Sequence, residues 1–129
     1  MNMGIILKLL VITLFTITLN AKSDNNENDK ETTKCITGQC SWYGAKFNGK
    51  KTASGEKFDS NKFTAAHKTL PFGTKLKITN TKSGKSTIVT VNDRGPFVKS
   101  RVLDISSAAA QELGVINKGI FTAEIEILD

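Results

Sequence analysis

Alternating apolar and polar residues recur along the second half of the chain and predict short β-strands. Strands are expected at 41–43, 75–79, 86–91, 101–105 and 123–128. Within 86–91, Thr87, Val89 and Val91 supply one β-branched face. The polar residues 80–85 between two of these strands predict a hairpin with a longer loop.

One short helix is expected after the strand at 101–105. Ser106 or Ser107 is suited to cap a helix over 108–113, and Gly114 is suited to end it. Many short strands with one helix fit a mainly β fold, a small closed barrel.

The N-terminus resembles a secretory signal more than a membrane span. Its uninterrupted apolar run, 9–19, has eleven residues, whereas a spanning helix needs about 20. We expect a signal peptide over 1–21 that is cleaved after Ala21, with an uncleaved anchor as the alternative. Cys35 is not preceded by a lipid-attachment box, so we expect an exported protein, periplasmic or secreted, that is not a lipoprotein and keeps no stable membrane anchor.

Residues 22–34 contain no large apolar side chain and predict a disordered polar leader. The remaining segment, 35–129, is long enough for one small core and no more. Neither an internal repeat nor a second domain is evident.

Basic residues are concentrated in the segment 35–129. The chain has 18 Lys and Arg against 12 Asp and Glu, a net charge of +6. A basic exported domain is drawn to anionic polymers such as cell-wall glycans or lipid headgroups. Nucleic acid is not expected as a partner, because no basic block with interleaved aromatic residues occurs. The alternative is a lysine surface that only aids solubility.

Two cysteines and one histidine limit the metal chemistry of the chain. These are too few soft ligands for a closed zinc site, so no metal and no cofactor are expected. Cys35 and Cys40 could close a small disulfide loop in an oxidising compartment or remain free thiols.

The segment 91–97 (VNDRGPF) contains the first candidate for catalysis. Asp93 and Arg94 lie where an alternating strand gives way to Gly95-Pro96. A carboxylate at such a junction is held by rigid backbone and still faces a cleft, as a catalytic acid requires. The alternative is a structural turn in which Asp93 binds amides and Arg94 pairs with it.

A second polar cluster lies earlier in the chain. Glu56 and Asp59 are three residues apart and could share one face of a turn, and His67 follows eight residues after Asp59. A lone histidine serves either as a buried hydrogen-bonding residue or as a catalytic group.

Several segments in order resemble the RlpA (rare lipoprotein A) family. They are GQCSWYG (38–44), TASGEKFD (52–59), TAAHKTLPFGTKLKITN (64–80), VNDRGPF (91–97) and RVLDISSAAAQELG (101–114). Together they cover nearly all of residues 38–128, with Cys40 in place of the family's usual alanine. The resemblance implies a six-stranded double-psi β-barrel with one or two short helices. It also implies an endolytic peptidoglycan transglycosylase that prefers glycan strands stripped of stem peptides.

The resemblance places the family's active-site cluster on Glu56, Asp59, His67 and Asp93. Cleavage between N-acetylmuramic acid (MurNAc) and N-acetylglucosamine (GlcNAc) needs a proton on the leaving oxygen, and we assign Asp93 as this acid and later base. His67 would bind Asp93 or position the sugar, and Glu56 and Asp59 would bind glycan or tune the acid. For substrate binding we expect Arg94, Trp42, Tyr43 and Phe97. Asp104 is expected to be structural, near the start of the helix.

The expected partner is therefore the peptidoglycan glycan strand, bound by a monomer. Many family members also carry a lipobox and a C-terminal SPOR glycan-binding domain, and neither is expected here. A non-catalytic, expansin-like module that binds wall glycan through the same groove is the alternative function.

Overall fold

The structure is a computed structural model that describes residues 34–128. The expected signal peptide (1–21) and all but the last residue of the expected leader (22–34) lie outside the described residues. Within the described part of the chain, no helix is both long and apolar enough to cross a bilayer.

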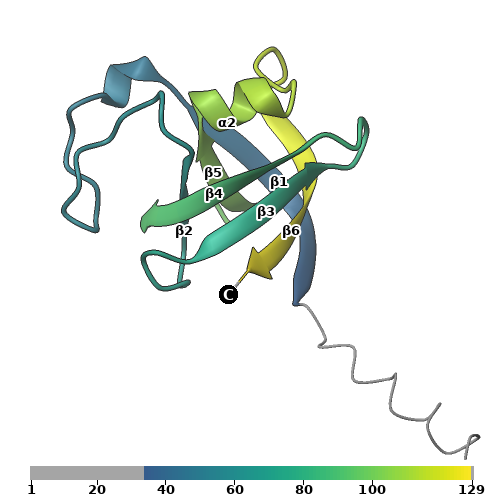
Figure 1. Cartoon of the computed structure of the whole chain (residues 1–129), viewed down its shortest axis with the longest axis horizontal. Coiled ribbons are helices and arrows are strands. Elements are labelled where there is room, and N and C mark those ends of the chain that lie inside the picture. The colour runs from purple at the N-terminus through teal and green to yellow at the C-terminus, as the bar shows by residue number, and fades with distance from the viewer. Residues whose placement is uncertain (1–33, 129) are drawn as a thin grey trace, which may run out of the picture. The chain divides into compact units, whose positions relative to one another are not determined.

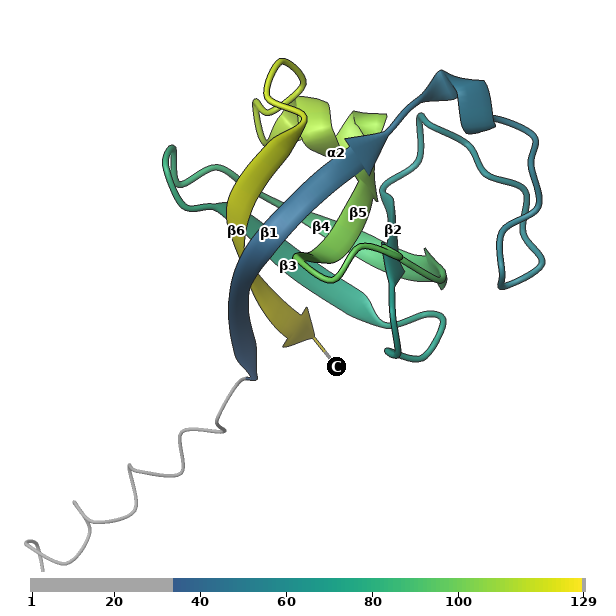
Figure 2. The same cartoon turned by 180° about the vertical axis from the view of Figure 1, so that it is seen from behind.

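Six strands close into a barrel in the order β1-β5-β2-β4-β3-β6 (Figures 1 and 2). The strands are β1 (Cys35–Tyr43), β2 (Thr64–His67), β3 (Lys75–Asn80), β4 (Ser86–Asp93), β5 (Arg101–Ser106) and β6 (Ile120–Leu128). Two neighbouring pairs, β1 with β5 and β2 with β4, are parallel, and the other four pairs are antiparallel. The expected six-stranded barrel is confirmed.

The alternating pattern of the strands fills the barrel with aliphatic side chains. On β4, Val89 and Val91 are buried, while Ile88, which points to the opposite face, is half exposed. On β3, Leu76 and Ile78 are fully buried in the same way. The predicted hairpin is also confirmed, because β3 and β4 pair antiparallel up to Thr79 opposite Ser86.

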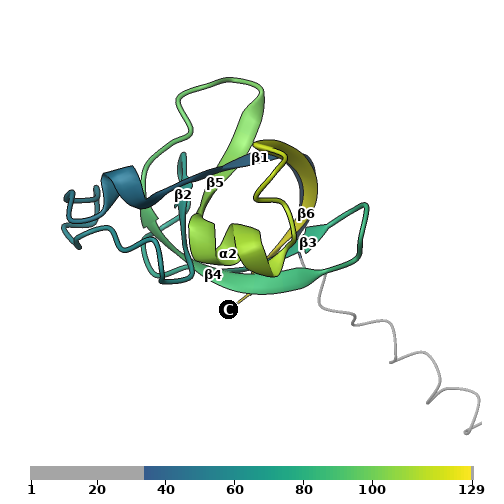
Figure 3. The ribbon, with the colours of Figure 1, turned by 90° about the horizontal axis from the view of Figure 1, so that it is seen from above.

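The expected helix forms as α2 (Ser107–Glu112), which begins one residue earlier than predicted. Its N-cap is Ser106, whose hydroxyl accepts a hydrogen bond from the Ala109 amide at 3.4 Å. Gly114 follows at φ +69°, a conformation that favours glycine. Figure 3 shows α2 lying across one end of the barrel, where Ala109 and Ala110 join the core.

Two segments near the site have structures that the sequence pattern does not predict. The strand β2 was not expected, and it lies between β5 and β4 with Ala65 and Ala66 buried. The segment 44–63 projects from the barrel beside β2 as a long loop (Figures 1 and 2). Its regular structure is one 3₁₀ turn, η2 (Ala45–Phe47), and a single bridge between Lys51 and Lys57.

Both cysteines lie on β1 as free thiols, Cys35 exposed and Cys40 buried. Five residues of extended strand separate their Cα atoms by about 16 Å, well beyond disulfide reach. Of the two alternatives that the sequence leaves open, the structure has the free thiols. Burial raises the pKa of the Cys40 thiol to about 12, with a further contribution from the negative charge of Asp104.

Candidate active site

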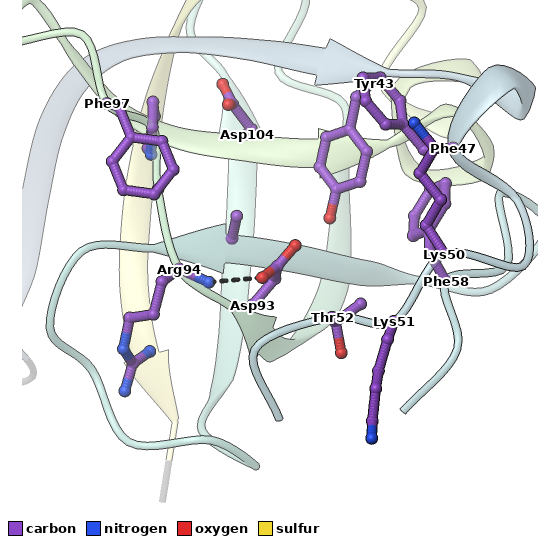
Figure 4. A pocket seen from close by; sticks show the side chains of 13 residues that line it. Tyr43, Phe47, Lys50, Lys51, Thr52, Phe58, Asp93, Arg94, Phe97 and Asp104 are labelled. Atoms are coloured by element: carbon purple, nitrogen blue, oxygen red, sulfur yellow. Dashed lines mark hydrogen bonds between the residues drawn. The ribbon is translucent and has the colours of Figure 1, made fainter. Parts of the chain in front are cut away.

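A cavity of about 280 Å³ lies between the long loop 44–63, the ends of the barrel strands and the turn after β4. Figure 4 shows the side chains around it. The lining residues are Tyr43, Phe47, Lys50, Lys51, Thr52, Phe58, Ala66, Asp93, Arg94, Gly95, Pro96, Phe97 and Asp104. Two carboxylates, three cations and four aromatic rings therefore surround one space.

Asp93 is the last residue of β4 and is held by two backbone amides. Its Oδ1 accepts hydrogen bonds from Ala53 N at 2.9 Å and from Arg94 N at 2.8 Å, the second of which is drawn in Figure 4. The first bond ties the long loop to the end of the strand. Within residues 34–128, Oδ2 has no hydrogen-bond partner, so one oxygen faces the cavity ready for a ligand.

A one-residue irregularity decides which β4 side chain reaches the cavity. β2 pairs Ala65 with Val91 but Ala66 with Asp93, so the register skips Asn92. Such a bulge re-aims the side chain that follows it. In a regular ladder Asn92 would face Ala66, and the bulge puts the carboxylate there instead.

Asp104, in the middle of β5, is the second carboxylate of the cavity. Its Oδ1 accepts a hydrogen bond from the Ser41 hydroxyl and lies 3.3 Å from Arg101 Nε, at ion-pair distance. It lies two residues before Ser106, the N-cap of α2, and so near the helix start as expected, but its side chain also lines the cavity. The sequence analysis therefore missed a residue of the cavity.

The Tyr43 hydroxyl is buried and has no hydrogen-bond partner among residues 34–128. In Figure 4 it points toward the Asp93 carboxylate. Burial raises the pKa of Tyr43 well above its ordinary value, the negative charges of Asp93 and Asp104 raise it further, and the neighbouring Thr64 side chain offsets part of the increase. The phenol therefore stays protonated and offers a donor to a ligand.

Aromatic rings form the wall of the cavity beside the long loop. The Tyr43 ring packs edge-on against Phe47 at 5.9 Å and lies 4.6 Å from Phe58, measured between ring centroids. The ammonium groups of Lys46 and Lys50 lie 5.1 Å and 5.2 Å from the Phe47 centroid. This wall combines apolar faces with positive charge.

Arg94 and Phe97 form the opposite edge. The Arg94 guanidinium lies over the Phe72 ring at 4.0 Å, and its Nη1 donates to the His67 carbonyl at 3.4 Å. Phe97 is 92% exposed, so its ring is available for a partner to stack on.

Comparison with known proteins identifies the family. Residues 36–125 match the family model described as lytic transglycolase. The chain belongs to this family. The RlpA family resemblance seen in the sequence is thereby confirmed, and the barrel is the double-psi β-barrel that it implies.

Curated relatives in the lytic transglycolase family are similar over the barrel alone. The endolytic peptidoglycan transglycosylase RlpA of Neisseria meningitidis serogroup A is 58% identical over 90 residues, which are 70% of this chain and 38% of the relative. The RlpA of Vibrio cholerae is 51% identical over 92 residues, 71% of this chain and 35% of the relative. The chain thus spans well under half the length of these relatives.

Solved structures confirm the fold. The Streptomyces papain inhibitor aligns with a TM-score of 0.62 at 20% identity, over 74% of this chain and 96% of the inhibitor. An expansin of Clavibacter michiganensis aligns with a TM-score of 0.60 at 22% identity, over 74% of this chain and 51% of the expansin. At these identities the likeness extends to the barrel fold and not to chemistry.

Four of the eight site residues expected for this lytic transglycolase domain line the cavity: Asp93, Arg94, Tyr43 and Phe97. The other four do not. Glu56 lies exposed on the long loop, and Asp59 accepts a hydrogen bond from the Asn61 amide of its own turn. Trp42 packs against the barrel core.

His67 is the fourth expected site residue that does not line the cavity, and its ring is hydrogen-bonded to backbone amides. Its Nδ1 accepts hydrogen bonds from the Thr69 and Leu70 amides at 3.1 Å and 3.0 Å. Within the described residues no hydrogen bond joins its ring to Asp93. Partial burial lowers the pKa of His67, and the positive charges of Arg94 and Lys68 lower it further. The neutral ring with an accepting Nδ1 carries its proton on Nε2.

In the part of the chain that the structure describes, no three His, Cys, Asp or Glu side chains gather at a distance suited to a metal ion.

Proposed function

We propose that this domain is an endolytic peptidoglycan lytic transglycosylase. It cleaves the MurNAc–GlcNAc bond of strands poor in stem peptides and leaves 1,6-anhydro-MurNAc ends, in wall remodelling or cell separation. The observation that carries the proposal is the Asp93 carboxylate, fixed through one oxygen by two amides and open to the cavity through the other. Relatives that share up to 58% of their barrel residues with this chain are named for this activity, which supports the proposal.

In this reaction Asp93, in its acid form, delivers a proton to the glycosidic oxygen as the bond from C1 to that oxygen breaks. The muramyl ring then carries positive charge shared between C1 and its ring oxygen. The C6 hydroxyl of the same sugar adds to C1 and gives its proton to the Asp93 carboxylate. The acid is restored, and no water molecule needs to be activated.

The rim of the cavity suits an anionic glycan. When a stem peptide is removed from MurNAc, a lactyl carboxylate remains, and Lys50, Lys51 and Arg94 supply positive charge at the rim. Phe97 and the Tyr43 ring offer faces on which sugar rings stack. The Tyr43 hydroxyl supplies a buried hydrogen-bond donor to the glycan.

Cell-wall glycan as the substrate requires that the protein be exported. We propose a periplasmic or secreted monomer that has no lipid anchor, as the apolar run at 9–19 suggests. Of the four expected residues that lie outside the cavity, His67 helps to position Arg94, because its backbone carbonyl accepts a hydrogen bond from the Arg94 guanidinium.

The test is incubation of the purified protein with amidase-treated murein sacculi, followed by mass spectrometry of the soluble products. The wild type is expected to release soluble, peptide-free glycan fragments that end in 1,6-anhydro-MurNAc. Asp93→Asn, which keeps the size and an accepting oxygen, is expected to lower release at least about 100-fold, the usual contribution of a general acid. Glu112→Gln, a charge removal on the exposed face of α2, serves as the control and should leave release unchanged.

Two results would contradict parts of this proposal. If the wild type releases no anhydro product but still pellets with the sacculi, the domain is a non-catalytic, expansin-like wall-binding module. If Asp93→Asn retains full activity, the acid is another carboxylate: Asp104 in the cavity, or Glu56 or Asp59 after a movement of the long loop.

A further inference from the structure

Asp93 and Asp104 lie in one row across three neighbouring strands. Ala66 of β2 is the register partner of Asp93 on β4 and also of Asp104 on β5. Directly paired residues project to the same face of a sheet, so all three line the cavity. Two strand spacings separate the two aspartate Cα atoms by about 10 Å. The small Ala66 side chain leaves the floor between them open.

Both carboxylates keep one oxygen without a partner in residues 34–128. Asp93 is bound at Oδ1 by the two amides, and Asp104 is held at Oδ1 by the Ser41 hydroxyl and the Arg101 guanidinium. These anchors fix the orientation of each group, as a preorganised site requires. Figure 4 shows the two side chains at separate heights along the cavity, with Asp104 above Asp93.

The buried Tyr43 hydroxyl belongs to the same cavity as both aspartates. Burial raises the pKa of Tyr43, and the negative charges of both aspartates raise it further. Asp93 and Asp104 therefore lie on either side of the space where a sugar would bind.

We propose that Asp104 is a second catalytic carboxylate, which stays ionised and stabilises the positive charge that develops on the muramyl ring. The inference rests on the proposed function and deepens it. The leaving oxygen and the incoming C6 hydroxyl approach C1 from the same face, because the 1,6-anhydro bridge closes where the leaving group departed. One residue, Asp93, therefore handles both protons.

The opposite face of the ring needs only negative charge. Asp104 supplies it without exchanging a proton and without forming a bond, so its Oδ1 anchors stay in place through the cycle. The row spacing, about 10 Å between the two Cα atoms, leaves space for a sugar ring between the two aspartates.

The test is Asp104→Asn on denuded murein, with product release measured across pH. The asparagine keeps an oxygen for Ser41 and Arg101 and removes only the charge. We expect kcat to fall about 100- to 1000-fold, as for loss of one preorganised electrostatic group, with wall binding and the melting temperature preserved.

Glu112→Gln, which removes a charge on the exposed face of α2, is the matched control and should retain wild-type activity. Wild-type kcat in Asp104→Asn overturns the proposal. A lowered melting temperature together with lost wall binding in Asp104→Asn also overturns it, since that result indicates a purely structural role. A wild type that releases no anhydro product overturns both the proposed function and this inference, whereas an active wild type with an active Asp104→Asn overturns the inference alone.

Discussion

At the scale of single residues, the site contains oxygen atoms that are hydrogen-bonded within the protein and oxygen atoms that have no partner among the described residues. Asp93 and Asp104 each use one oxygen for the protein. The Tyr43 hydroxyl uses none, although it is buried among residues 34–128. A buried hydroxyl without a partner costs stability, so its presence at a cavity points to a ligand that satisfies it.

Replacement of Tyr43 by Phe separates stability from function. Removing the unpartnered hydroxyl should leave the free energy of unfolding unchanged or raise it by up to about 1 kcal/mol. Affinity for denuded glycan should fall about fivefold, the equivalent of one neutral hydrogen bond of roughly 1 kcal/mol. Urea unfolding and a sacculus-binding isotherm check the two effects, and a loss of stability in this variant would show that the hydroxyl is bonded within the protein.

His67 predicts a pH dependence of stability. Its folded-state pKa lies below the value in the unfolded chain, which is about 6.5. Between these two pKa values the unfolded chain binds more protons than the folded chain, so the free energy of unfolding decreases as pH falls through this window. Protonation of Nδ1 would also break its hydrogen bonds with the Thr69 and Leu70 amides.

His67→Asn provides the comparison, because its side-chain oxygen replaces the accepting Nδ1 and does not titrate. Urea unfolding at pH 7.5 and pH 5 should show a smaller decrease in the variant than in the wild type. Equal decreases in both proteins would place the pH dependence on other groups.

The candidate site was partly predictable from residue chemistry. Asp93 and Arg94 stood out because a polar pair follows a regular strand and precedes Gly95-Pro96. Asp104 could not be recognised in the same way, because a carboxylate within an alternating strand has no local signal that it faces a cavity. The signal that identifies it is the pairing of β5 with β2, which joins residues far apart in the sequence.

At the scale of elements, the strands with strict alternation were the predictable ones. The hairpin of β3 and β4 and the helix α2 follow from local patterns and cap chemistry. β2 escaped prediction because it has four residues, of which the two central ones are buried alanines. Its parallel pairing with β4 and the bulge at Ala66 are long-range features that a local pattern does not encode.

The cap of α2 yields a prediction at this scale. The buried Ser106 hydroxyl accepts from the Ala109 amide at 3.4 Å and from the Thr64 amide at 3.5 Å, so it joins the helix start to β2. Ser106→Ala should lower the free energy of unfolding by about 1–2 kcal/mol, equivalent to a decrease of several degrees in Tm. Thermal unfolding measures it, with the exposed Ser100→Ala as the control, and an unchanged Tm would show that the cap contributes nothing.

At the scale of the whole domain, the charge and the site belong to different parts of the structure. The chain carries a net charge of +6, and the described residues contain a single ion pair, Arg101 with Asp104. Most cations are therefore available to an anionic polymer, and two carboxylates, Asp93 and Asp104, line the cavity. This division suits a protein that is attracted to the wall by its surface and acts on it in one place.

The bulge between β2 and β4 has a consequence for how such a domain changes over evolutionary time. The apolar core positions of β4 end at Val91, and the residue that enters the cavity comes two positions later, after the skipped Asn92. Selection for a stable apolar core and selection for a given chemistry therefore act on different positions of the same strand. A lineage can exchange the residue at position 93 and lose an activity while it inherits the apolar core intact.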